Sequence, residues 1–156
     1  MSTVAWRIVH RRFAKIAFTG AGARLFGGRW NSPGRPVVYA AQSQALAALE
    51  ILVHLDFEKL LRHYLAIPVT IPSHLIEHLS PTSFPKNWRA CPAPRGTRAI
   101  GDAWLARGAS PVLQVPSVVI PSESNFLLNP AHPHFSKLRP GKPVPFLFDP
   151  RLTGTR

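Results

Sequence analysis

The sequence predicts an α+β fold: a single compact domain with mixed or antiparallel sheets and short helices. Short β-branched stretches recur along the chain, and only two segments show the periodicity of an amphipathic helix. The chain also has 17 prolines in 156 residues, which break it into short elements and argue against a helical bundle. This length and a hydrophobic fraction of 46% suit one domain over residues 1–156.

The first half of the chain is expected to hold two strands and one helix. In order, we expect a strand over Thr3–Val9, an irregular glycine-rich stretch over Phe13–Phe26, a turn over Gly27–Gly34 and a short strand over Pro36–Ala40. Ser43 has the side chain of a helix N-cap, and the apolar residues after it predict a helix ending near His54 or Leu61.

The second half is expected to alternate strands, loops and one further helix. We expect a strand over Leu65–Ile71, followed by a proline-punctuated loop over residues 72–96 with one helical turn near His74–Leu79. A helix should then run over Thr97–Arg107 and end at Gly108. After it we expect a strand over Val112–Ile120 interrupted at Pro116-Ser117, a loop over Ser124–Pro130 and a last strand over Val144–Phe148. Pro68 suggests that its strand lies at an edge or contains a bulge.

Charge and cysteine content limit the functional class. The chain has 19 Lys and Arg against 7 Asp and Glu, and this excess attracts polyanions. The basic residues are dispersed and form no tail, so we expect no direct nucleic-acid binding. One cysteine excludes an internal disulfide, and no long apolar run predicts a membrane span. We therefore expect a cytoplasmic protein.

Glu50 is the first carboxylate in the chain, and it lies inside the apolar run Ala45–Leu55. Burying an acidic side chain there is costly, so we expect it to have a binding partner or a catalytic role. One interpretation is structural: a pair with His54 one helical turn later, or a buried salt bridge to an arginine. The other is catalytic, because a carboxylate in a low-dielectric site stabilises a cationic transition state.

Other motifs carry less information by themselves. Arg29 follows two glycines, and Arg7 lies within a strand; each is either a ligand-facing guanidinium or a solvated surface cation. Tyr39 is either a ligand-facing or an ordinary strand aromatic residue. Gly20-Ala21-Gly22 does not fit the dinucleotide fingerprint, because no helix is expected to start there. The seven histidines lack companions at ligand spacing, so we expect no metal site.

Two separated motifs resemble the RES-domain family, which is named after an arginine, a glutamate and a serine. The first runs from Gly27-Gly28-Arg29-Trp30-Asn31 through Val37-Val38-Tyr39 to Ala47-Ala48-Leu49-Glu50, and the second from Val115-Pro116-Ser117 through Asn125 to Asn129-Pro130. The resemblance extends over nearly the whole chain. It is weakest over residues 72–96.

This resemblance implies a bacterial toxin of a type II toxin–antitoxin system with an ADP-ribosyltransferase-like fold. It implies that NAD⁺ is consumed as a substrate, with no metal, and that the partner is an antitoxin with an Xre-type helix-turn-helix domain. A homodimer within that complex stays open. On the same resemblance, Arg29, Tyr39 and Glu50 are the catalytic residues, and Arg7, Ser117 and Asn129 support the binding of NAD⁺.

The chemistry of NAD⁺ cleavage is consistent with these residue types. Cleavage of the nicotinamide–ribose bond leaves an oxocarbenium-like ribose, which a carboxylate such as Glu50 stabilises. Tyr39 could stack on nicotinamide while Arg7 and Arg29 neutralise the pyrophosphate. The acceptor of the ADP-ribosyl group (water, phosphate or a protein) stays open. Two alternatives also stay open: a toxin that binds or cleaves RNA through its basic surface, and a non-enzymatic binding module.

Overall fold

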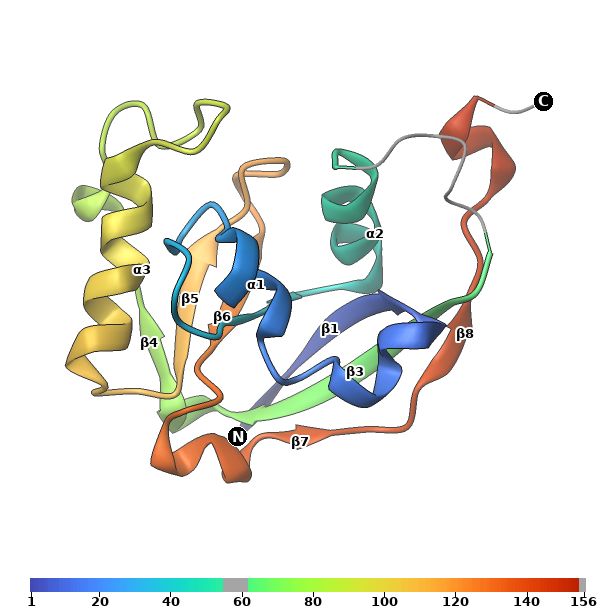
Figure 1. Ribbon diagram of the computed structural model, residues 1–156, viewed down its shortest axis with the longest axis horizontal. Helices are drawn as coiled ribbons and strands as arrows, with labels where there is room; N and C mark the ends of the chain where they lie inside the picture. Colours follow the sequence, from blue (N-terminus) through green and yellow to red (C-terminus); the bar gives the residue numbers. More distant parts are fainter. Residues whose placement is uncertain (55–61, 155–156) are drawn as a thin grey trace.

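The computed structural model describes residues 1–54 and 62–154 and folds them around one curled sheet (Figure 1). Within this part of the chain, eight strands follow the order β4-β5-β6-β2-β1-β3-β7, and β8 pairs with β3 beside β7. The strands are β1 (Ser2–His10), β2 (Val38–Ala41), β3 (Tyr64–Pro72), β4 (Ile76–His78), β5 (Val112–Pro116), β6 (Ser124–Leu128), β7 (Arg139–Pro140) and β8 (Val144–Phe146). All pairs are antiparallel except β4 with β5.

The sheet consists of two halves that meet at one residue pair. β1 pairs with β3 along its whole length, from Ser2 opposite Pro72 to His10 opposite Tyr64. In contrast, β1 meets β2 at a single bridging pair, Trp6 opposite Ala41. The two strands therefore separate after this bridge, and side chains fill the space that a continuous ladder would occupy.

Three α-helices flank the described sheet: α1 (Ala21–Phe26), α2 (Gln44–Leu52) and α3 (Arg95–Arg107). Ser43 caps α2, because its hydroxyl accepts a hydrogen bond from the Leu46 N–H at 3.1 Å. Gly108 ends α3 in the left-handed conformation. In Figure 1, α3 runs alongside β4 while α2 stands near the junction of β1 and β2. The remaining turns are the 3₁₀ helices η1 (Arg11–Ile16), η3 (Ser73–Leu75), η4 (Pro81–Ser83), η5 (Pro133–Lys137) and η6 (Pro150–Thr153).

Most strands and both longer helices were predicted, three expectations were wrong and one was partly right. Ser124–Leu128 is a strand inside the sheet and not a loop. The helical turn expected near His74–Leu79 is present as η3, but Ile76–His78, which follow it, form strand β4. A helix does start at Ala21, and Arg11–Ile16 is a 3₁₀ helix, so the Phe13–Phe26 stretch is largely helical. Short elements of this kind take their conformation from tertiary packing, which local propensity does not report.

Two further expectations need refinement. The strand that starts at Val112 ends at Pro116 and does not resume. Pro68 lies in β3, between β1 on one side and β7 and β8 on the other, so its strand is not a simple edge. Its carbonyl accepts from the Gly141 N–H at 2.7 Å, opposite the interruption between β7 and β8. Since a strand residue's N and O point the same way, the missing N–H of Pro68 faces that interruption.

The core supports a single compact α+β domain. One cluster of buried residues lies between β2, β3, β5 and β6, and others lie under α2 and between α3 and the β5–β6 face. The largest fully buried side chains include Trp30 and Trp104. Within the described residues, no helix has the length and apolar character needed to cross a membrane. The alternative helix end at Leu61 falls outside the described residues.

Candidate active site

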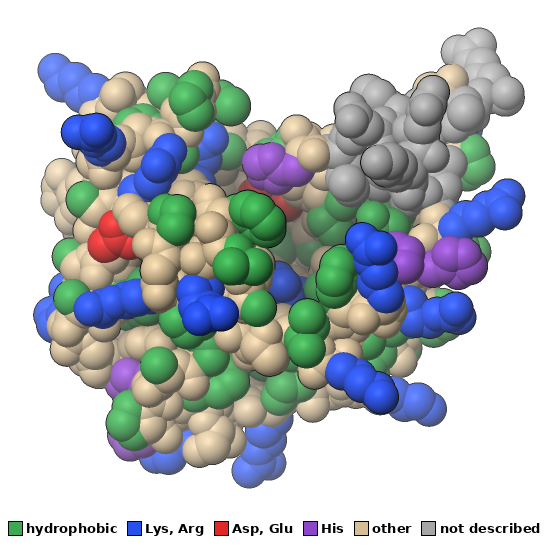
Figure 2. All heavy atoms as spheres, viewed as in Figure 1, with side chains coloured by type: hydrophobic (Ala, Val, Ile, Leu, Met, Phe, Trp, Pro, Cys, Tyr) green, Lys and Arg blue, Asp and Glu red, His purple; other side chains and the backbone are tan. Residues whose placement is uncertain are grey.

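A cavity of about 710 Å³ opens where β1 and β2 separate. This volume is in the range of small-molecule binding sites, about 300–1,000 Å³. Residues of β1, β2, η1, α1 and α2 line it, and most of its surface is apolar. Figure 2 shows hydrophobic side chains around a hollow in which an acidic side chain is visible. Among the described lining residues, the charged side chains are those of Arg7 and Glu50.

Glu50 lies on α2 and is held through one of its two carboxylate oxygens. Its Oε1 accepts hydrogen bonds from Ser117 Oγ at 2.6 Å and from Asn125 Nδ2 at 2.7 Å. The structure gives Oε2 no hydrogen bond from any described residue. Neither of the structural interpretations, a pair with His54 or a salt bridge to an arginine, is formed in the described part of the chain. The carboxylate is thus oriented by neutral donors and keeps its charge available.

Ser117 lies behind Glu50 and is fully buried. Its Oγ donates to Glu50 and accepts from the backbone N–H groups of Val119 and Ile120, each at 3.1 Å. Ser117 is not among the residues that line the cavity. The hydroxyl therefore connects the carboxylate to a backbone turn, and its hydrogen bond stabilises one orientation of Glu50.

Arg7 occupies the space between the two separated strands. Its Nη1 donates to the carbonyl oxygen of Tyr39 at 2.9 Å, while its Nε is buried and has no partner among the described residues. Burial lowers the pKa of the Arg7 guanidinium to about 10, because desolvation disfavours the charged form. Arg7 is still protonated at neutral pH, so it places a positive charge in the cavity wall.

Tyr39 lines the cavity, and its hydroxyl is engaged elsewhere. Tyr39 Oη donates to Asn31 Oδ1 at 2.6 Å and accepts from the Trp30 N–H at 3.2 Å. Burial raises the pKa of the Tyr39 hydroxyl above its ordinary value. Gly28 is required beside it, since a Cβ there would lie 2.6 Å from Tyr39 Oη. The glycine-rich turn thus anchors Tyr39.

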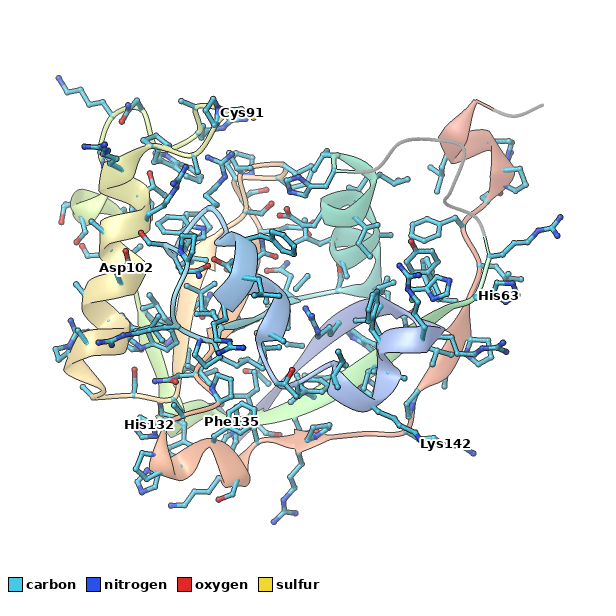
Figure 3. All side chains as sticks on the ribbon, viewed as in Figure 1. His63, Cys91, Asp102, His132, Phe135 and Lys142 are labelled. Atoms are coloured by element: carbon cyan, nitrogen blue, oxygen red, sulfur yellow. The ribbon has the colours of Figure 1, made fainter. Side chains whose placement is uncertain are left out.

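Helix α3 holds this turn in place. A Cβ on Gly101 would lie 1.6 Å from the Trp30 carbonyl oxygen, so only glycine permits the observed approach. Two residues after Trp30, Ser32 donates its N–H and its hydroxyl to the Asp102 carboxylate, at 2.8 and 2.6 Å. Asp102 is labelled on α3 in Figure 3. The two contacts fix the turn that positions Tyr39.

Arg29 points away from the cavity and binds a loop. Its Nη1 donates to the carbonyl oxygens of Trp88 and Ala90, at 3.0 and 2.8 Å. Arg89 in the same loop donates to the Val118 carbonyl oxygen at 3.4 Å, next to Ser117. Arg29 is not among the cavity-lining residues. Its contacts indicate a structural connection between the glycine-rich turn and the loop.

The structure therefore brings three of the six candidate residues to the cavity. Arg7, Tyr39 and Glu50 line it, Ser117 supports Glu50, and Arg29 and Asn129 lie elsewhere. Asn129 follows β6 at the end away from Asn125, where its Oδ1 accepts from the Ala131 N–H at 3.0 Å.

Sequence reasoning missed Asn125 as a partner of Glu50. The reason is that the segment Ser124–Leu128 was assigned to a loop. A polar residue followed by the apolar run Phe126-Leu127-Leu128 is the signal that could have placed it at the start of a buried strand.

Comparison with known proteins shows which proteins the chain is similar to. A model of the RES domain matches residues 4–149 of the chain. A protein named Toxin Res from Yersinia enterocolitica is 43% identical over 148 residues, which cover 94% of this chain and 97% of that protein. The Prs ADP-ribosylating toxin of Sphingobium sp. strain YBL2 is 38% identical over 157 residues, covering 97% and 98%.

The fold also matches that of a solved structure, the toxin–antitoxin complex MbcT–MbcA of M. tuberculosis. The TM-score is 0.76 at 20% sequence identity, and the match covers 99% of this chain and 88% of the other. This similarity concerns the fold alone. The match to the family model and the identity to the curated relatives show that the chain belongs to the RES-domain family.

Proposed function

We propose that this protein is the toxin of a toxin–antitoxin system and that it cleaves the nicotinamide–ribose bond of NAD⁺ in the cavity between β1 and β2. One observation carries the proposal. The Glu50 carboxylate is oriented by Ser117 and Asn125 through Oε1, in the wall of a largely apolar cavity that is also lined by the partly buried cation Arg7. The relatives named Toxin Res and Prs ADP-ribosylating toxin support the same class of activity.

The proposed reaction uses each cavity residue for a separate task. When the glycosidic C–N bond breaks, its electron pair leaves with the pyridinium nitrogen, and neutral nicotinamide departs. Positive charge then develops on the ribose C1′ and ring oxygen, and the Glu50 carboxylate stabilises it in surroundings of low dielectric. Arg7 attracts the pyrophosphate, and the ring of Tyr39 provides an aromatic surface for nicotinamide.

The second half of the reaction needs an acceptor oxygen or nitrogen. Its lone pair forms the new bond to C1′ and it then loses a proton. Water, inorganic phosphate and a protein side chain all satisfy this chemistry, and the name of the Sphingobium relative, Prs ADP-ribosylating toxin, favours transfer of the ADP-ribosyl group over hydrolysis. The acceptor decides whether the enzyme is a glycohydrolase, a phosphorylase or an ADP-ribosyltransferase.

We propose an antitoxin as the protein partner, in line with the MbcT–MbcA complex that shares the fold. An Xre-type helix-turn-helix protein, a homodimer within the complex and a cytoplasmic location belong to the same proposal. The exposed apolar side chains of Phe13, Leu25 and Phe26 at the cavity provide a surface for such a partner.

The test is to incubate the purified chain with NAD⁺ and to follow nicotinamide release. Separate reactions contain buffer alone, inorganic phosphate or a bacterial lysate as a source of protein acceptors. We expect release in at least one of them, and the additive that accelerates release identifies the acceptor. Intact NAD⁺ in every reaction would refute the proposal.

A further inference from the structure

We propose that Asn125 is a positioning residue for the Glu50 carboxylate. Asn125 Nδ2 lies 2.7 Å from Glu50 Oε1. A carboxylate only accepts hydrogen bonds, so this contact determines which end of the amide faces Glu50. The inference rests on the proposed function for its catalytic consequence, but the pairing itself is a property of the fold.

The carbonyl end of the Asn125 amide indicates that the residue is placed to bind Glu50 and not to complete its own hydrogen bonds. Asn125 Oδ1 is buried and has no hydrogen-bond partner among the described residues. A buried acceptor without a hydrogen-bond partner destabilises the folded state. Asn125 therefore contributes less to stability than a fully bonded amide would, which is the pattern expected where function selects the residue.

The backbone around Asn125 is suited to holding its amide in one position beside Glu50. Asn125 lies in β6, inside the sheet, where it is paired with Ala41 of β2 on one side and Val115 of β5 on the other. The Ala41 position is also the one that meets Trp6, at the junction of the two half-sheets. A rigid strand in this place holds the amide where the cavity begins.

Asn125 and Ser117 together restrict the carboxylate in two directions. Both donate to the same oxygen, Glu50 Oε1, from a strand and from a turn respectively. Two donors on one oxygen fix the plane of the carboxylate and direct Oε2 away from them. The oxygen without a partner among the described residues is therefore the one that faces a developing positive charge.

Asn125→Leu tests the role, because leucine has nearly the same size and lacks the donor. We expect kcat for nicotinamide release to fall about 10- to 100-fold, with KM changed less than about threefold. Gln114→Leu is the matched control. Its amide is on the neighbouring strand β5, donates to Ser124 Oγ and is not part of the cavity, so kcat should stay within about twofold of wild type.

A double-mutant cycle with Glu50→Ala separates positioning from general damage. If Asn125 acts through Glu50, Asn125→Leu should lower kcat no further once Glu50 is absent, and the shifts in denaturation midpoint should not add. Wild-type kcat in Asn125→Leu, or losses that multiply in the double variant, would overturn the inference. If the wild-type protein released no nicotinamide, the proposed function would fail. The pairing of Asn125 with Glu50 would still be tested, because denaturation-midpoint shifts that add in the double variant would contradict it.

Discussion

Glu50 owes its orientation to two neutral donors, and this choice of partners has a consequence for the charge. An arginine partner would neutralise the carboxylate, whereas a hydroxyl and an amide leave the negative charge in place. The surrounding cavity is largely apolar, so the charge acts at longer range than it would in water. The cation of the described cavity wall, Arg7, also leaves this charge unpaired, because it bonds to the backbone carbonyl of Tyr39 and not to Glu50.

Tyr39→Phe distinguishes a stacking role from proton transfer. The Tyr39 hydroxyl is bonded to both Trp30 and Asn31, and its raised pKa opposes ionisation, so we expect only the ring to act on the substrate. The variant should lose about 1–2 kcal/mol of unfolding free energy, measured by denaturant titration. Its kcat should remain within about threefold of wild type. A loss of kcat of two orders of magnitude in folded protein would show that the hydroxyl takes part in the reaction.

Arg7→Met tests the anion-binding role of the cavity cation. Methionine fills much of the same volume without charge, so KM for NAD⁺ should rise at least about tenfold at neutral pH. In the wild type, the affinity for NAD⁺ should also be lost as the pH rises through about 10, where Arg7 becomes neutral. Equal KM values for the variant and the wild type would exclude contact between Arg7 and the pyrophosphate.

At the scale of elements, the glycine-rich turn organises one side of the site from outside the cavity lining. Trp30 packs against Phe84 and Trp88, with ring centroids 6.1 Å from each, and Arg29 binds the backbone of the same segment. We refer to residues 84–90 as the aromatic loop. Through Arg89 this loop reaches the turn that contains Ser117. These contacts within the protein favour a structural role for Arg29, and its catalytic role stays a prediction.

Arg29→Met should separate these two interpretations of Arg29. If Arg29 holds the aromatic loop, its loss should increase proteolytic cleavage and amide hydrogen exchange within residues 84–90. KM for NAD⁺ should stay within about threefold of wild type, because Arg29 does not line the cavity. A large rise in KM with unchanged exchange would instead place Arg29 on the substrate.

The elements also show where sequence reasoning succeeds and where it stops. Ser43, Gly108 and the alternation of Thr3–Val9 are local signals, and the structure confirms the helix start, the helix end and the strand that they predict. By contrast, β4 is three residues long and exists because it pairs with β5. The local pattern of apolar residues does not predict such pairing.

The candidate site shows the same limit. The prediction that Glu50 needs a partner follows from its apolar surroundings, but the identity of that partner depends on contacts across 67 and 75 positions of the chain. Arg7 and Arg29 have similar surroundings in the sequence. Only the separation of β1 from β2, a property of the sheet, decides which of the two reaches the cavity.

At the scale of the whole molecule, the net charge of +12 does not define a nucleic-acid site. Figure 2 shows basic side chains spread over this face without gathering into one patch, while hydrophobic side chains surround the hollow. A dispersed field of this kind attracts anions at low ionic strength and is screened at physiological salt. The charge is compatible with an anionic substrate and with an acidic partner.

We expect RNA to bind only weakly and with a steep dependence on salt, and not to be cleaved. The measurement is electrophoresis of labelled RNA after incubation with the protein at about 50 and 200 mM salt. An excess of RNA should leave nicotinamide release unchanged at the higher salt concentration. Specific cleavage of RNA by the wild-type protein would support the alternative of an RNA-cleaving toxin.

We propose that the Glu50 carboxylate drives the cleavage of NAD⁺ in this cavity, and nicotinamide release by Glu50→Gln decides whether it does. The side-chain carbonyl oxygen of this variant can still accept from Ser117 and Asn125, so the fold should persist while the charge is lost. Glu123→Gln is the matched control, because Glu123 does not line the cavity. We predict wild-type release for Glu123→Gln and a loss of at least about 100-fold in kcat for folded Glu50→Gln. Wild-type activity in Glu50→Gln would contradict the claim.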